Sequence, residues 1–81
     1  MAKPSEKFAG DPALVAIGAA IRRARKQVGL SQEALAMDAG LDRSYMGGIE
    51  RGEHNFAVMT VAKIADALKM SPSELFNLAG L

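Results

Sequence analysis

The stretch LSQEALAMDAGLDRSYMGGIERGE, residues 30–53, predicts two short helices joined by a turn. Ser31 and Asp42 belong to residue types that cap helix N-termini, and Gly40 and Gly52 belong to the type that most often ends a helix. These signals predict helices over residues 32–39 and 43–51. The short link between them contains glycine, which is the spacing of a helix-turn-helix, although such turns also join helices in ordinary bundles.

Small or apolar residues stand where these two crossing helices would touch. They are Leu35, Ala36, Gly40, Leu41, Met46 and Ile49. This pattern leaves Arg43, Ser44 and Gly47 on the outer face, at the start of the second helix of the pair. A recognition helix presents this N-terminal face to base edges in the major groove of DNA.

The flanking sequence predicts three more helices and no strand. Asp11 and Pro12 open a first helix that ends at Gly29. Its apolar stripe is Leu14, Ile17, Ile21, Ala24 and Val28. A fourth helix is expected over residues 58–69, and the capping box SPSE, residues 71–74, opens a fifth. Residues 1–10 are expected to form a flexible arm.

Composition limits the classes of function. The chain has 81 residues, enough for one small core, and it contains no cysteine, so neither a disulfide framework nor a thiolate metal site can form. With one histidine, no phosphate-binding loop and no paired-carboxylate motif, we expect no enzyme, no metal and no cofactor. No apolar run approaches the roughly 20 residues that span a bilayer, and the first residues lack a signal peptide's apolar segment, so a cytoplasmic protein without a membrane partner is expected.

Charge leaves two interpretations open. The formal net charge is only +1, which is low for a DNA-binding domain. Basic residues nevertheless gather in Arg22, Arg23, Arg25 and Lys26. This cluster is either a solvated helix face or a surface that binds phosphates.

Residues 30–53 resemble the Cro and lambda-repressor type of helix-turn-helix regulator, the XRE family. The shared pattern is Leu-Ser/Thr-Gln, then Leu-Ala, then Gly, then an aliphatic-Glu-Xaa-Gly ending, and VAKIADALKMSPSELF, residues 61–76, resembles the family's last two helices. The size and the segment RSYMGGIERGE look most like restriction-modification controller proteins. The resemblance implies an all-α, five-helix, lambda-repressor-like domain over residues 11–81, with the helix-turn-helix formed by helices 2 and 3.

The resemblance also implies roles by position. Arg43, Ser44 and Gly47 match base-contacting positions, and arginine can bind guanine O6 and N7 as a bidentate pair. Candidate contacts with the DNA backbone are Gln32, Tyr45, Arg51, His54, Asn55 and Arg22. Tyr45 as a packed rim residue and His54 as an ordinary surface-loop histidine are the alternatives. Glu50 matches a position that pairs with an arginine of the first helix, here Arg25, which would make Arg25 structural.

Gly47 and Gly48 depart from many family members, which carry a polar side chain at these positions. We expect both glycines on the face opposite the buried residues. Their absence of side chains would let the backbone approach the groove closely, or let the helix adjust on docking. Drift at unselected positions is the remaining alternative.

Apolar residues at the C-terminal end predict a dimer. Phe76, Leu78 and Leu81 cannot all share the buried face with Leu75, because neighbouring helix positions are about 100° apart. The predicted function is a sequence-specific regulator of transcription that binds double-stranded DNA as a homodimer on a palindromic operator. The alternative is a protein-interaction module, such as an antitoxin or a partner of another regulator. Further partners, such as the transcription machinery or a cognate toxin, stay open.

Overall fold

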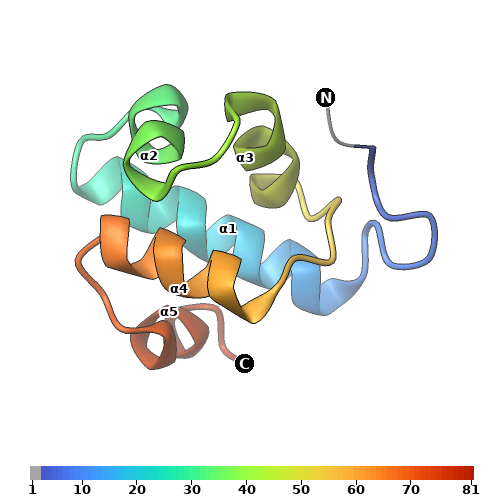
Figure 1. Ribbon diagram of the computed structural model, residues 1–81. Coiled ribbons are helices and arrows are strands. Elements are labelled where there is room, and N and C mark those ends of the chain that lie inside the picture. The colour runs from blue at the N-terminus through green and yellow to red at the C-terminus, as the bar shows by residue number, and fades with distance from the viewer. Residues whose placement is uncertain (1–2) are drawn as a thin grey trace.

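Five helices form the chain in the computed structural model, which describes residues 3–81 (Figure 1). Their bounds are α1 Pro12–Gln27, α2 Gln32–Ala39, α3 Arg43–Glu50, α4 Val58–Ala67 and α5 Pro72–Leu78. The described part of the chain contains no strand, so the predicted all-α class with five helices is confirmed. No helix of residues 3–81 is both long enough and apolar enough to cross a membrane.

Side chains cap four of the five helices at their N-termini, as their sequences predict. Asp11 Oδ1 accepts a hydrogen bond from the backbone of Ala13 at 2.9 Å, and Ser31 Oγ accepts one from Ala34 at 3.0 Å. Asp42 caps α3. The capping box of α5 is complete, because Glu74 N donates to Ser71 Oγ at 3.0 Å and Ser71 N donates to Glu74 Oε1 at 2.8 Å. These local bonds fix where each helix begins.

Three predicted helix ends differ from the structure. Helix α1 ends at Gln27, with Val28 as its C-cap, rather than at Gly29. Helix α3 ends one residue early, with Arg51 as its C-cap, and α4 ends at Ala67 rather than Lys69. Lys69 has a φ of +58°, a left-handed conformation that cannot continue a helix. Val28, expected in the buried stripe of α1, is exposed because it caps that helix and the chain turns away there.

One core holds the five helices together. Helix α1 packs against α3 and α5, while α2 packs against α3 and α4 (Figure 1). The larger side chains that are fully buried in this core are Ile21, Leu35, Met46, Ile49, Ile64 and Leu75. Every helix contributes buried side chains to this core, and in α3 only the first turn is accessible, with Arg43 exposed and Ser44 half-buried.

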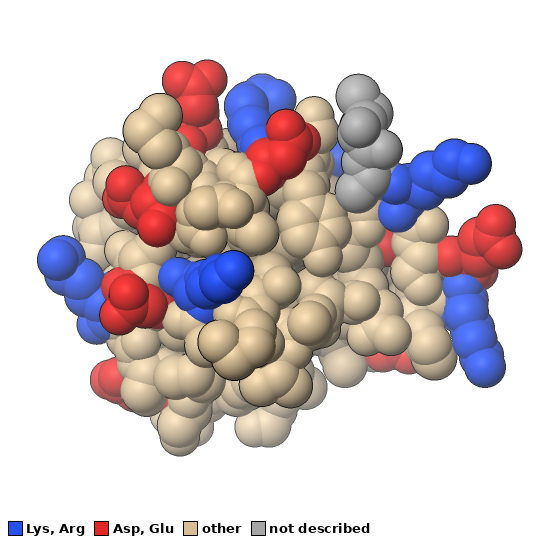
Figure 2. All heavy atoms as spheres, in the orientation of Figure 1, with Lys and Arg blue, Asp and Glu red and all other residues tan. Residues whose placement is uncertain are grey.

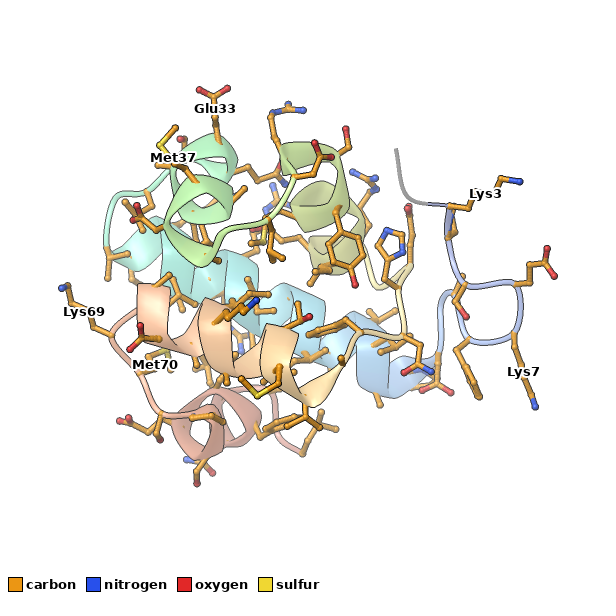
Figure 3. All side chains as sticks on the ribbon, viewed as in Figure 1. Lys3, Lys7, Glu33, Met37, Lys69 and Met70 are labelled. Carbon is orange, nitrogen blue, oxygen red and sulfur yellow. The ribbon has the colours of Figure 1, made fainter. Side chains whose placement is uncertain are left out.

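The chain before α1 folds back toward the end of α3. Ser5 N donates to the carbonyl oxygen of Glu53 at 2.7 Å, and Gly10 N donates to that of Gly52 at 2.8 Å. Lys3 and Lys7 extend from this segment away from the helices (Figure 3). The flexibility expected for residues 1–10 stays a prediction, and Met1 and Ala2 lie outside the described residues.

Candidate nucleic-acid interface

The first turn of α3 carries two of the three predicted base-contacting residues, Arg43 and Ser44. Asp42 Oδ2 accepts hydrogen bonds from the backbone of Ser44 at 3.0 Å and of Tyr45 at 3.3 Å, which fixes the first turn. Arg43 is exposed and Ser44 is half-buried. Both line a notch of about 330 Å³. The residues around this notch are Pro4, Gln32, Arg43, Ser44, Gly47, Arg51, Glu53 and His54.

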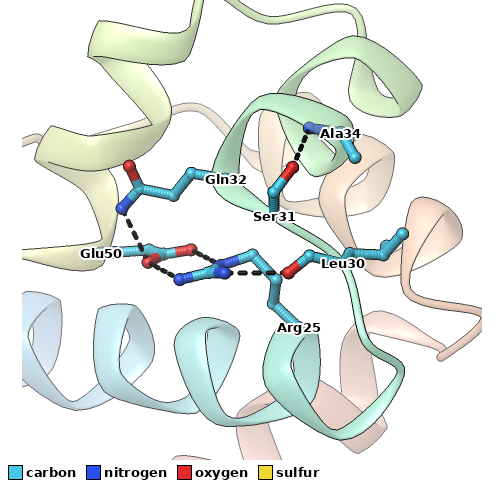
Figure 4. Close-up of polar contacts among 6 residues, drawn as sticks. All are labelled: Arg25, Leu30, Ser31, Gln32, Ala34 and Glu50. Carbon is cyan, nitrogen blue, oxygen red and sulfur yellow. Dashed lines mark hydrogen bonds and ion pairs between the residues drawn. The ribbon is translucent and has the colours of Figure 1, made fainter.

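A buried polar network holds the other end of α3 (Figure 4). Arg25 and Glu50 form the ion pair that the family resemblance implies, with Nε–Oε2 at 2.7 Å and Nη2–Oε1 at 3.0 Å. Gln32 Nε2 donates to Glu50 Oε1 at 3.0 Å, and Arg25 Nη1 donates to the carbonyl oxygen of Leu30 at 2.9 Å. The two charged side chains are only 10% and 3% exposed, so this network ties α1, α2 and α3 together rather than offering Arg25 to a ligand.

Gly18 of α1 lets α1 and α3 come into backbone contact at this network. A Cβ at Gly18 would overlap the carbonyl oxygen of Ile49 and lie 2.7 Å from that of Glu50. The glycine therefore sets how closely α3 lies on α1. No sequence signal marks it, because nothing in the spacing of α1 shows which residue meets the backbone of another helix.

Gly47 and Gly48 are both buried, so the expectation that they lie opposite the buried face is wrong. Gly48 faces His54, whose Nε2 and Cδ2 atoms occupy the space that a Cβ would need. Gly47 lies at the notch, where a Cβ would be 3.1 Å from Arg51 Nη1 and 3.4 Å from Gln32 Oε1. The two glycines therefore have different roles. Gly48 leaves room for the ring of His54, and the absence of a side chain at Gly47 keeps the notch open.

His54 is not the surface-loop histidine that was the alternative to a DNA contact. It is only 6% exposed, and its ring centroid lies 4.7 Å from that of Tyr45 at a tilt of 49°. Tyr45 is half-buried, which agrees with a packed rim residue. The contact of these two rings packs the loop after α3 onto the helix. Asn55, the next residue, is exposed and does not line the notch, because it borders a separate hollow beside Phe8 and Leu14.

The basic cluster of α1 separates onto different faces. Arg22 is exposed and shares a helix face with Gly18 and Arg25, toward α3. Arg23 points the other way, and its Nη2 donates to the carbonyl oxygen of Leu78 at 2.8 Å, which ties α1 to the end of α5. On the face drawn in Figure 2, acidic and basic side chains are interspersed, so no single-sign patch dominates it.

Arg51 is exposed on the rim of the notch and is paired. Its Nε donates to Glu53 Oε2 at 2.8 Å, and the two side chains are 61% and 31% exposed. The hydrogen bond and the charge of Glu53 raise the pKa of Arg51, and the hydrogen bond from Arg51 lowers the pKa of Glu53. Glu53 was not among the predicted site residues.

The three apolar residues predicted at a dimer interface are all exposed in the single chain. Phe76 is 39% exposed, Leu78 36% and Leu81 57%. Leu75, which was expected on the buried face, is fully buried.

No group of three or more histidine, aspartate or glutamate side chains in residues 3–81 is arranged to hold a metal ion.

The helix-turn-helix family matches residues 21–75 of the chain. The control protein C.SmaI of Serratia marcescens is 41% identical over 61 residues, which cover 75% of this chain and 73% of that protein. The HTH-type transcriptional regulator SlrR of Bacillus subtilis (strain 168) is 40% identical over 62 residues, which cover 75% of this chain but only 41% of that longer protein.

Among solved structures, the restriction-modification controller protein C.AhdI from Aeromonas hydrophila has the same fold. It is 50% identical, with a TM-score of 0.75, and the match covers 76% of this chain and 94% of that one. These relatives are regulators of transcription and not enzymes, which agrees with the function class predicted from the sequence. The chain belongs to the helix-turn-helix (XRE-type) family of transcriptional regulators, and its homologues include restriction-modification controller proteins.

Proposed function

We propose that this regulator binds a palindromic DNA operator as a homodimer and reads each half-site with the first turn of α3. The observation that carries the proposal is the notch at the start of α3, where Arg43 and Ser44 project beside Gly47. A helix held on one side and bare at its N-terminal turn on the other is the form that enters a major groove. Within the cytoplasm, where the sequence predicts the protein to be, its target would be double-stranded DNA.

Arg43 is assigned to a base edge, and Ser44 to the neighbouring base. Arg43 is exposed and has a side chain long enough to donate two hydrogen bonds to guanine O6 and N7. Gly47 adds no side chain of its own there, and the guanidinium of Arg51 lies over it. Phosphate contacts position the helix without reading sequence. The residues assigned to them are Gln32, Tyr45, Arg51, His54, Asn55 and Arg22.

Two copies of the chain supply enough contact for specific binding. A single small module buries only about 600–1,000 Å² against DNA. A two-fold pair doubles this area and reads half-sites about 34 Å apart. Exposed Phe76, Leu78 and Leu81 support pairing through α5. Val58 and Met59 at the start of α4, which packs on α5, add further exposed apolar surface to this part of the molecule.

Binding-site selection from a random duplex library tests the proposal. We expect a two-fold symmetric consensus. Against that consensus, Arg43→Ala should weaken binding by about 1–3 kcal/mol and relax the preference at one base of each half-site. Arg22→Ala serves as the matched arginine control, because loss of a phosphate contact weakens binding to all sequences alike and reduces the salt dependence.

The outcomes separate the two functions considered. Selection of no duplex at low salt would reject DNA reading and favour the protein-interaction module. A consensus without two-fold symmetry, bound by one chain, would reject the homodimer but keep the reading helix. If Arg43→Ala weakens binding to every sequence equally, Arg43 contacts the DNA backbone and not a base edge.

A further inference from the structure

Glu53 places a carboxylate on the rim of the notch by which the protein would bind DNA. Its backbone is fixed on both sides, since Glu53 N donates to the carbonyl oxygen of Gly48 at 3.0 Å and its own carbonyl oxygen accepts from Ser5 N at 2.7 Å. The side chain lines the notch together with Arg43 and Ser44. A fixed negative charge there opposes the approach of a phosphate, so its presence requires an explanation.

The partner of that carboxylate is Arg51, which Glu53 holds along one edge. Arg51 Nε donates to Glu53 Oε2 at 2.8 Å, and Arg51 Nη2 approaches Glu53 Oε1 at 3.4 Å. The third nitrogen of the guanidinium, Nη1, lies over Gly47, 3.1 Å from the position of an added Cβ. The pairing leaves the Nη1 edge as the part of Arg51 that faces the notch.

Because of this geometry, the attraction between Arg51 and a DNA phosphate depends on where the phosphate lies. A phosphate seated at the notch can accept from Nη1 while Nε and Nη2 keep their carboxylate, because a guanidinium has five N–H donors. A phosphate placed elsewhere meets a pair whose charges cancel, together with the negative oxygens of Glu53. An unpaired arginine would instead follow phosphates in many positions on its flexible stem.

We propose that Glu53 is a specificity-determining residue of the DNA-binding surface: it holds Arg51 in one orientation and cancels its charge for phosphates that are not seated at the notch. The inference rests on the proposed function, and it adds a role for an acidic residue that does not itself contact DNA. Its consequence is weak binding to random DNA with little loss at the operator. The low net charge of the chain, +1, is consistent with such restraint on non-specific binding.

The test compares Glu53→Gln with Asp66→Asn, which removes one negative charge from an exposed position on α4. Binding is measured by fluorescence anisotropy between 50 and 200 mM salt, on the selected operator and on a scrambled duplex of equal length. Freeing one arginine for phosphate should steepen the salt slope on the scrambled duplex by about 0.9 and strengthen low-salt binding there about threefold or more. Operator affinity should rise by less, so the ratio of the two affinities falls.

Several outcomes decide the matter. Equal strengthening on both duplexes, or the same behaviour in Glu53→Gln as in Asp66→Asn, would overturn the role of Glu53. In an Arg51→Gln background the effect of Glu53→Gln should disappear, and its persistence would also overturn the proposal. A wild-type protein that selects no duplex would reject the proposed function and this inference together. If the wild type selects an operator but Glu53→Gln leaves the ratio of operator affinity to scrambled-duplex affinity unchanged, the inference alone is rejected. Far-UV circular dichroism confirms that each variant is folded.

Discussion

Alanine substitution should have opposite effects on stability at two helical glycines, Gly18 in α1 and Gly47 in α3. At Gly18 the added Cβ would overlap one carbonyl oxygen of α3 and lie 2.7 Å from that of Glu50. Both neighbours are backbone atoms, so relief requires α1 and α3 to move apart. At Gly47 the nearest atom is Arg51 Nη1 at 3.1 Å, the far end of a flexible side chain that can shift by a few tenths of an ångström.

The expected magnitudes follow from two opposing effects. Replacing glycine by alanine inside a helix stabilises a protein by about 0.5–1 kcal/mol. Overpacking costs about 1–3 kcal/mol, and contact with backbone falls in the upper part of that range. We therefore expect Gly18→Ala to lower the free energy of unfolding by about 1–2 kcal/mol, and Gly47→Ala to raise it by up to about 1 kcal/mol. For a domain of this size, 1 kcal/mol moves Tm by about 4–8 °C.

Urea and thermal denaturation followed by circular dichroism at 222 nm measure both variants beside the wild type. Gly47→Ala is the matched control, because it makes the same chemical change within a helix without meeting backbone. A Gly18→Ala protein as stable as the wild type, or as Gly47→Ala, would refute the claim that Gly18 sets the contact of α1 with α3. Similar m values in all three proteins would show that differences in their denaturation midpoints report differences in stability.

Three further predictions concern charge and assembly. Glu50→Ala should cost about 3 kcal/mol of stability because it leaves Arg25 buried without its carboxylate, and the double variant with Arg25→Ala should cost less than the sum of the single changes; additive denaturation energies would contradict the coupling. Phe76→Glu should separate a dimer into folded helical monomers by placing a charge in an apolar interface, as sedimentation would show; a wild type that is monomeric well above micromolar concentration, or a variant that stays dimeric, would reject the interface. Arg51→Gln should raise the pKa of Glu53 toward its ordinary value in a carboxyl NMR titration, because the hydrogen bond from Arg51 lowers the wild-type pKa. The stabilising effect of the pair is therefore present above the ordinary pKa of a glutamate and is lost as the pH falls through the lowered pKa of Glu53. A titration midpoint that does not move would contradict the pairing in solution.

Local signals predicted the helices well, because caps act on backbone groups a few residues away. Ser31, Asp42 and Ser71 each begin a helix at the predicted place. The ends were harder to predict, since the end of α4 depends on Lys69 adopting a left-handed conformation that few residues other than glycine take. The ion pair of Arg25 and Glu50 became predictable only through family resemblance, because 25 positions separate the two residues.

The parts of the interface that sequence did not reveal all depend on contacts between distant segments. Gly18 matters because of two carbonyl groups of α3, and Gly48 matters because of the ring of His54. Neither partner is visible from spacing along a single helix. Nothing in the sequence singles out Glu53, since its significance comes from Arg51 and from the backbone of Ser5.

The residues that hold α3 in place are different from the residues that face outward from it. This separation affects how a protein of this kind could come to bind a new operator. Gly18, Arg25 and Glu50 hold the helix from behind, whereas positions 43 and 44 project from its exposed first turn. If these positions read bases as proposed, substitutions on that turn would alter base preference without repacking the core. A library randomised at these two positions would consist mostly of folded proteins, and selection could act on preference for DNA sequence alone. Diverging copies of such a gene could lose cross-talk with each other's promoters through very few codon changes.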